Sequence, residues 1–349
     1  MGADPRIVGG RCGGHVPILS SGGGRARPGI LGPISSPSLS PPDRPCDRPG
    51  DRQTDHPDLS QVVARLRAAG CVFAEDEAHL LISETADGSE LAERLDRRVR
   101  GEPLEHLLGW AEFDGLRVGV GPGVFVPRRR SELLVREGFR FLREVAASRS
   151  RGERTPHQLT GAMPHRRRVL DLCCGCGALA AALVTRWARA ALDVADLEVH
   201  ATDSDPVAVG WARRNLAGTG QVHCGDLFSA LPGHLAGRLD LVMVNAPYVP
   251  TSGLTTMPPE ARLHEPRAAL DGGPDGLDVQ RRAIAQLGSW LAPSGAVMIE
   301  TGRAQAPVTS ALAQAQGLVA RVVHEPELEA TIVIGLAPVR GPVDLPSVR

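Results

Sequence analysis

The chain has 349 residues, a hydrophobic fraction of 42% and a formal net charge of −1. This length allows one large domain or two modest ones, and the near-neutral charge provides no global attraction to nucleic acid or to an anionic membrane. All 39 basic residues are arginine, so mechanisms that require a lysine, such as Schiff-base catalysis, are excluded.

Residues 1–57 are rich in Gly, Pro, Ser, Arg and Asp without apolar periodicity, which predicts a disordered tail. No stretch approaches the ~20 apolar residues of a membrane span and no signal-peptide core is visible, so we expect a cytoplasmic protein that binds no membrane. Three of the seven cysteines lie together at 173–176, but no second cluster of possible metal ligands follows at a suitable spacing. We therefore expect reduced thiols and no metal site.

From Leu59 onward, apolar residues recur at helical spacing and predict three helices in a small domain at residues 58–115. The alternating stretches 116–120 and 124–127 predict a short hairpin, and 131–147 predicts a helix. Residues 116–147 would then connect two domains. A polar, arginine-rich linker is expected at 148–168, and a C-terminal tail at 339–349.

Strand and helix patterns alternate along the remaining chain. Helical patterns separate the first five strands, which predicts an α/β fold with a mostly parallel sheet and helices on both faces. The last two strands lie close together and could pair antiparallel at the sheet edge. The expected strands are Val169–Leu172, Leu197–Thr202, Gln221–Cys224, Leu239–Val244, Ala296–Glu300, Ala320–His324 and Ala330–Leu336.

The first of these strands ends at Asp171 and Leu172 and opens into a turn that contains two glycines. Ligands of parallel α/β sheets bind beyond the carboxyl ends of the strands, and glycine lets the backbone approach them closely. Taken alone, such a turn also fits an ordinary βα loop or a dinucleotide-binding fold. The turn is Cys173-Cys174-Gly175-Cys176-Gly177, and it precedes a helix from Ala178.

Carboxylates also follow the second and third strands. Asp203 is placed to accept hydrogen bonds from ribose hydroxyls, whereas Asp205, followed by Pro206, is expected to cap a helix. Asp226 is placed to accept from an adenine amino group, with Leu227 against the ring. This recurrence at one sheet edge predicts a nucleoside-containing cofactor.

The chain's single tyrosine lies in Asn245-Ala246-Pro247-Tyr248, directly after the buried strand 239–244. Asn245 and the Ala246 carbonyl could accept the two hydrogens of a planar –NH2 group while Tyr248 packs against its face. An amide nitrogen is a poor nucleophile, so fixing its orientation and excluding water would raise the rate of transfer. A strand-ending turn with a packed tyrosine is the structural alternative. The pattern favours methylation of an amide or amine nitrogen by S-adenosyl-L-methionine, with Asn245 also near the cofactor.

Several blocks between residues ~60 and 337 resemble the protein-(glutamine-N5) methyltransferases that modify peptide chain release factors. The resemblance implies a seven-stranded class I methyltransferase (Rossmann-like) domain at 169–338 and a helical substrate-recognition domain at 58–115. It also implies the glutamine of a release factor's Gly-Gly-Gln motif as the substrate. The blocks are GEPLEHLLG at 101–109, FVPR at 125–128 with SE at 131–132, NAPY at 245–248 and EPRAALDGGPDGLD at 265–278.

The chain departs from the family pattern at a few positions. Ala246 replaces the first proline of Asn-Pro-Pro-Tyr, and Cys173 replaces the first loop glycine, where its side chain could crowd the cofactor's methionine portion. Arg129 and Arg130 replace a Pro-acidic pair. Two alternatives remain: amino methylation of a nucleic-acid base, against which the lack of a basic, aromatic-laced module argues, and a non-catalytic protein that binds S-adenosyl-L-methionine.

Overall fold

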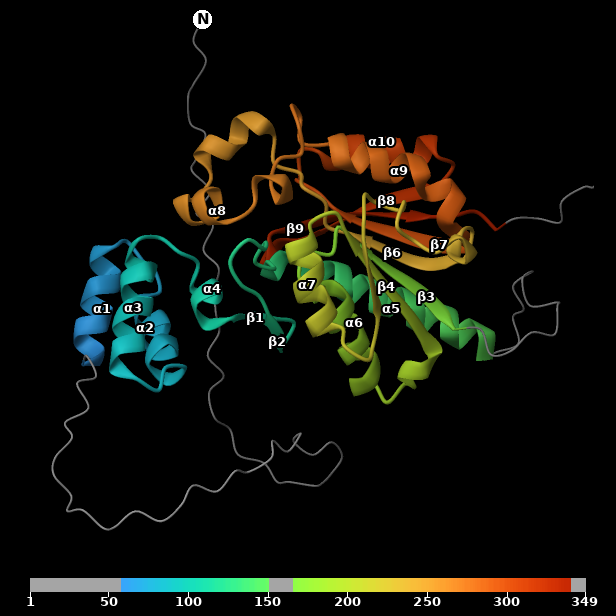
Figure 1. Ribbon diagram of the computed structural model, residues 1–349. Coiled ribbons are helices and arrows are strands. Elements are labelled where there is room, and N and C mark those ends of the chain that lie inside the picture. Colours follow the sequence, from blue (N-terminus) through green and yellow to red (C-terminus); the bar gives the residue numbers. More distant parts are fainter. Residues whose placement is uncertain (1–57, 151–165, 340–349) are drawn as a thin grey trace, which may run out of the picture. The chain divides into compact units, whose positions relative to one another are not determined.

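The computed structural model describes residues 58–150 and 166–339 (Figure 1). The chain divides into two compact units, with the boundary in the sequence between Leu95 and Asp96. The predicted tail at 1–57, most of the predicted linker at 148–168 and residues 340–349 lie outside the described residues. The unit boundary falls within a helix, whereas the sequence placed the end of the helical domain at residue 115.

The first unit packs helices around a small apolar core. Its elements are α1 (Leu59–Ala68), α2 (Ala74–Ser83) and the first two turns of α3 (Gly88–Val99), as the apolar periodicity predicted. Each helix buries one stripe of its surface, which stabilises helices too short to persist alone. The buried apolar residues are Val62, Leu66, Ala74, Ala78, Leu81, Leu91 and Leu95.

The second unit begins with the end of α3, followed by α4 (Leu104–Leu108) and an antiparallel hairpin of β1 (Trp110–Phe113) and β2 (Leu116–Gly119). The predicted hairpin of 116–120 with 124–127 was wrong. Asp114 and Gly115 adopt φ values of 52° and 70°, and two such residues form the tight turn that joins hairpin strands. Residues 124–127 run outside any strand and contribute instead to a cavity wall.

The predicted sheet is confirmed, with seven strands in the order β5-β4-β3-β6-β7-β9-β8. Within this sheet β3 to β7 pair parallel, and β9 pairs antiparallel with both β7 and β8, so the last two strands lie at one edge as predicted. The strands are β3 (Arg167–Leu172), β4 (Leu197–Asp203), β5 (Gln221–Cys224), β6 (Leu239–Val244), β7 (Leu291–Glu300), β8 (Val319–Glu325) and β9 (Ala330–Leu336).

Helices cover both faces of the sheet (Figure 1). One face carries α5 (Glu132–Ser150), α6 (Ala178–Arg189) and α7 (Pro206–Asn215), and the other carries α9 (Asp278–Trp290) and α10 (Ala306–Ala315). The short helix α8 (Pro259–His264) lies in the long connection between β6 and α9.

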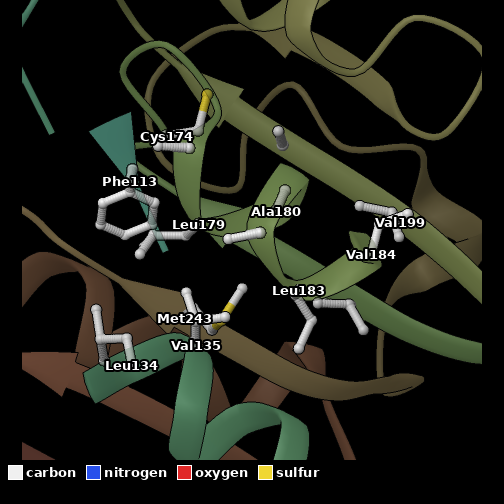
Figure 2. Close-up of a cluster of buried hydrophobic side chains, with 14 of the residues drawn as sticks. Phe113, Leu134, Val135, Cys174, Leu179, Ala180, Leu183, Val184, Val199 and Met243 are labelled. Carbon is white, nitrogen blue, oxygen red and sulfur yellow. The ribbon is translucent and has the colours of Figure 1, made fainter. Parts of the chain in front are cut away.

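Two apolar clusters follow from the alternation of side chains along buried strands. In β6, Met243 belongs to the cluster under α5 and α6, whereas its neighbours Val242 and Val244 belong to the cluster under α9. Figure 2 shows part of the first cluster, where Met243 lies beside Val135 of α5. This packing on both faces fixes the strand ends from which the site is built.

Candidate active site

One cavity of about 220 Å³ is lined by residues that follow β3, β4, β5 and β6. It contains Cys173 and Gly175 from the glycine turn together with Asn245 and Tyr248 from the segment after β6. The two predicted halves therefore share one cavity at the carboxyl edge of the sheet. Residues 123–131, which precede α5, complete part of its wall.

The glycine turn is fixed by its backbone against β4. The amide of Gly175 donates to Asp203 Oδ2 at 2.9 Å, and the amide of Cys174 donates to the Thr202 carbonyl at 2.9 Å. Both Cys173 and Gly175 adopt left-handed backbone conformations, with φ values of 61° and 54°. Glycine adopts this conformation without steric cost but cysteine does not, so the turn carries backbone strain at Cys173.

The three cysteines of the turn are protonated thiols. Burial raises the pKa of Cys173 and Cys174 well above the usual range and that of Cys176 to about 12, and the carboxylate of Asp171 raises these pKa values further. The side chain of Cys174 packs into the apolar cluster near Phe113 (Figure 2). A thiol reacts and binds metals as the thiolate, so these residues act through their shape and backbone.

Two residues that the sequence assigned to cofactor binding, Asp171 and Gly177, do not line the cavity. Asp171 is fully buried, and its Oδ2 accepts a hydrogen bond from the Ala180 amide of α6 at 3.0 Å. Burial raises the Asp171 pKa to about 8. Gly177 has a φ of 79°, and a Cβ there would lie 3.2 Å from Ala212 Cβ in α7. These residues lie behind the wall, where they join the turn to its helices.

Asp203 lies at the cavity wall, where its carboxylate also accepts a hydrogen bond from the Asp205 amide at 2.9 Å. Burial raises the pKa of Asp203. Its two oxygens keep lone pairs beyond the two backbone bonds, so the group can still accept hydrogen bonds from a ligand. The expected helix cap is confirmed, because the Asp205 side chain accepts from the Val207 amide at 2.8 Å and Pro206 begins α7.

Asp226 and Leu227 line another part of the cavity. The Asp226 carboxylate forms an exposed ion pair through Oδ2 with Arg282 of α9, which also lines the cavity. The Leu227 side chain is buried although its backbone has a φ of 49°. Arg282 was not predicted at this site, because α9 begins more than fifty residues after β5.

Asn245 is half-buried and directs one side of its amide toward the segment that precedes α5. Its Nδ2 donates to the hydroxyl of Ser131, a buried residue 114 positions earlier in the chain, at 3.1 Å. The Asn245 Oδ1 forms no hydrogen bond with any residue in the described ranges 58–150 and 166–339. The side chain is thus held by its donor end while its acceptor remains available. Ala246 is almost fully buried and also lines the cavity.

Tyr248 lines the same cavity, and its hydroxyl donates to Oε1 of Glu300 at 3.0 Å. Burial, and then the charge of Glu300, raise the pKa of Tyr248 well above its usual range, so the phenol is neutral. Pro247 lies between these residues in the wall. Ser131 and Glu300 were not predicted as partners from the sequence, although Glu300, like Asp203, is a carboxylate at the carboxyl end of an apolar strand.

Within residues 58–150 and 166–339, no group of three or more His, Cys, Asp and Glu side chains is arranged to hold a metal ion. The helices of the same ranges include none that combines the length and apolar character needed to cross a bilayer. The expectation of a cytoplasmic protein stays a prediction.

The chain is similar to known methyltransferases. Residues 156–324 match the family model described as "Methyltransferase small domain". The "Release factor glutamine methyltransferase" of Deinococcus radiodurans is 33% identical over 282 residues, which cover 76% of this chain and 91% of that protein. The proteins of the same name from Geobacter sulfurreducens and Streptomyces coelicolor are 36% and 37% identical over 60% and 58% of this chain, and the matches span 64% of each of those proteins.

Proposed function

Because this chain belongs to the release factor glutamine methyltransferase family, we propose that it methylates the side-chain amide nitrogen, N5, of the glutamine in the Gly-Gly-Gln motif of peptide chain release factors. The chain is an S-adenosyl-L-methionine-dependent methyltransferase. The observation that carries the choice of substrate is the unengaged Asn245 Oδ1 in a cavity shared with the glycine turn.

The described residues fit the cofactor. The cavity offers the carboxylates of Asp203 and Asp226 as acceptors and the apolar side chains of Leu227 and Val279 beside them. A Cβ built on Gly175 would meet nothing within 4 Å, so the turn leaves open space next to its backbone. The two carboxylates suit the hydroxyls and the amino group of the cofactor, and the two apolar side chains suit its flat aromatic ring.

We assign the ribose hydroxyls to Asp203 and the adenine amino group to Asp226, through the oxygen that Arg282 does not engage. Cys173, Cys174 and Cys176 would line the methionine portion together with Gly175. Asp171 and Gly177 would act indirectly by supporting the turn. When bound, S-adenosyl-L-methionine supplies an activated methyl group on a positively charged sulfur.

Asn245 and Ala246 would hold the substrate amide. The Asn245 Oδ1 and the Ala246 carbonyl each accept one hydrogen of the glutamine –NH2, while Tyr248 packs against the face of the carboxamide. These contacts aim the nitrogen lone pair and replace the water around it, which lowers the entropic part of the barrier. As the N–C bond formed, the bond between the methyl carbon and the cofactor sulfur would break and its electron pair would stay on the sulfur. The methylated nitrogen would then lose one proton to solvent, so no strong base is needed.

Methylation of a nucleic-acid base is less well supported. The three cavity arginines for which acidic partners are seen are Arg128 with Glu265, Arg130 with Glu300 and Arg282 with Asp226. Such pairing leaves little net positive charge in the wall to attract a phosphate backbone.

The proposal is tested by incubating the protein with methyl-labelled cofactor and purified release factors, alongside the same factors with Gln→Ala in the Gly-Gly-Gln motif. We expect label on the native factors only, and one added methyl group on the glutamine side chain by mass spectrometry. Label that persists on the Gln→Ala factors would defeat the proposed target. Cofactor binding without transfer to any factor would indicate a non-catalytic protein.

A further inference from the structure

The geometry around Tyr248 points to a role for a residue that the proposed chemistry leaves unused. We propose that Arg130 is a positioning residue that, through the buried carboxylate of Glu300, fixes the ring of Tyr248 in the substrate cavity. This inference rests on the proposed function for its kinetic consequence, but its structural content can be tested without any substrate.

Glu300 is the junction between the two residues. It ends β7, and its side chain is only 2% exposed. Its Oε1 accepts hydrogen bonds from the Tyr248 hydroxyl at 3.0 Å and from Arg130 Nε at 3.2 Å, whereas its buried Oε2 has no partner within the described ranges. A buried carboxylate is costly unless a cation accompanies it, so Arg130 offsets part of the cost of burying this acceptor beside the tyrosine hydroxyl.

Arg130 also contacts the tyrosine directly. Its guanidinium carbon lies 5.7 Å from the centroid of the Tyr248 ring, within the range of cation–π attraction. Both side chains line the cavity. The ring is therefore held through its face and through its hydroxyl by the same arginine, once directly and once through Glu300.

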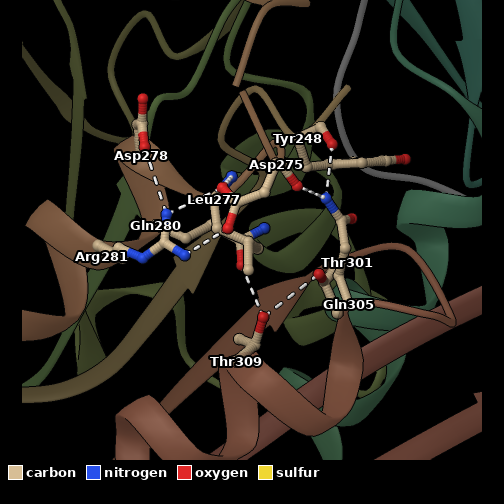
Figure 3. Close-up of polar contacts among 9 residues, drawn as sticks. All are labelled: Tyr248, Asp275, Leu277, Asp278, Gln280, Arg281, Thr301, Gln305 and Thr309. Atoms are coloured by element: carbon tan, nitrogen blue, oxygen red, sulfur yellow. Dashed lines mark hydrogen bonds and ion pairs between the residues drawn. The ribbon is translucent and has the colours of Figure 1, made fainter. Parts of the chain in front are cut away.

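The backbone of Tyr248 is held by a separate set of contacts. Gln305 Nε2 donates to the Tyr248 carbonyl at 3.0 Å and to the Asp275 carbonyl at 2.9 Å, as Figure 3 shows. The carbonyl of Glu300 likewise accepts from Gln280 Nε2 at 3.0 Å. Because these contacts do not involve Arg130, its loss should release the ring while the loop stays in place.

The chain offers a direct readout, because Tyr248 is its only tyrosine. Protein labelled with 13C at the phenolic carbon of tyrosine gives one NMR signal from the ring, whose position depends on the hydrogen bond of the hydroxyl. We expect this signal to shift and broaden in Arg130→Gln and to lie closer to the native position in Arg130→Lys, which keeps the charge.

The matched control is Arg303→Gln. Arg303 is exposed and makes no hydrogen bond or ion pair with the described residues, so this variant removes the same charge without touching the network. An Arg130→Gln signal indistinguishable from that of Arg303→Gln would overturn the inference. Glu300→Gln should also move the signal, and adding Arg130→Gln to it should have less effect than Arg130→Gln alone, since both act through one contact. Additive shifts would contradict the shared route.

The kinetic consequence separates this inference from the proposed function. With release factor as substrate, Arg130→Gln should lower kcat/KM about tenfold, the equivalent of one lost hydrogen bond, while the cofactor dissociation constant changes less than about twofold. Full activity in Arg130→Gln would overturn the inference while the proposed function stands. A tyrosine signal that responds as expected in a protein that methylates no release factor would defeat the proposed function alone.

Discussion

The cofactor half and the transfer half of the cavity are held in different ways. Around the glycine turn, backbone amides donate to carboxylates and carbonyls at the ends of neighbouring strands, as Gly175 does to Asp203. Around Asn245 and Tyr248, side chains bond to side chains that come from 114 and 52 positions away. The first arrangement is made by the backbone and should tolerate changes of side chain, whereas the second depends on individual residues.

The largest effect on turnover is expected at Asn245, in the transfer half. Asn245→Ala should lower turnover by on the order of a hundredfold or more, because it removes an acceptor that fixes the reacting nitrogen, and should leave cofactor affinity nearly unchanged. Methylation rates at saturating cofactor and calorimetric titration of the cofactor measure the two quantities. Asp226→Ala provides the opposite pattern, with weaker cofactor binding and a smaller loss of saturated turnover. A parallel collapse of cofactor affinity in Asn245→Ala would remove this residue from the transfer role.

Acid should destabilise the fold through a pair of histidines in β4 and β5, the strands that lead to Asp203 and Asp226. His200 of β4 is fully buried, and its Nδ1 lies 3.1 Å from His223 Nε2 of β5. Burial lowers the pKa of both histidines, a shift that the contact of His200 with Glu198 only partly offsets. The unfolded chain therefore takes up protons below about pH 6.5 that the folded protein does not, so stability falls as pH falls.

For His200 the slope of the unfolding free energy should approach about 1.4 kcal/mol per pH unit, and the half-buried His223 should contribute less. Chemical denaturation at a series of pH values between 7.5 and 5 measures this slope. His223→Gln should flatten the dependence, and the exposed His79→Gln should not. Equal slopes in all three proteins would mean that this pair does not govern the acid response.

A smaller effect on the transfer half is expected from Ser131. Ser131→Ala removes the partner of Asn245 Nδ2 and should lower turnover about tenfold, since the Asn245 amide is then free to rotate. Ser131→Thr retains the hydroxyl and should restore most of the rate. If the alanine and threonine variants behaved alike, the hydroxyl would have no part in orienting Asn245.

The smallest effect is expected at Cys173, whose φ of 61° is unfavourable for any residue with a Cβ. Cys173→Gly should raise stability by about 1 kcal/mol or less, because relief of strain exceeds the added entropy of the unfolded chain. Cys173→Ala keeps the Cβ and should not share the gain in thermal denaturation. Both variants remove the thiol. Tighter cofactor binding in both would show that the thiol crowds the cofactor. Tighter binding in the glycine variant alone would point to backbone strain at residue 173.

The difference between the two halves of the cavity also explains which features could be predicted from the sequence. The strand ends, the turn, the Asp205 cap and the grouping of polar residues at one sheet edge follow from local patterns, because strand direction brings the carboxyl ends together. The hairpin was misplaced because alternation at 124–127 outweighed the Asp114-Gly115 turn signal. Ser131, Glu300 and Arg130 were not predicted as partners, because side-chain contacts between distant segments leave no spacing to detect.

A crystal structure with S-adenosylhomocysteine and a glutamine peptide containing Gly-Gly-Gln would show how the protein holds the substrate amide. We expect the glutamine amide nitrogen within hydrogen-bonding distance of both Asn245 Oδ1 and the Ala246 carbonyl, with its carboxamide plane against Tyr248. A glutamine side chain bound elsewhere in the cavity, with Asn245 turned toward the protein interior, would show that Asn245 does not hold the substrate amide.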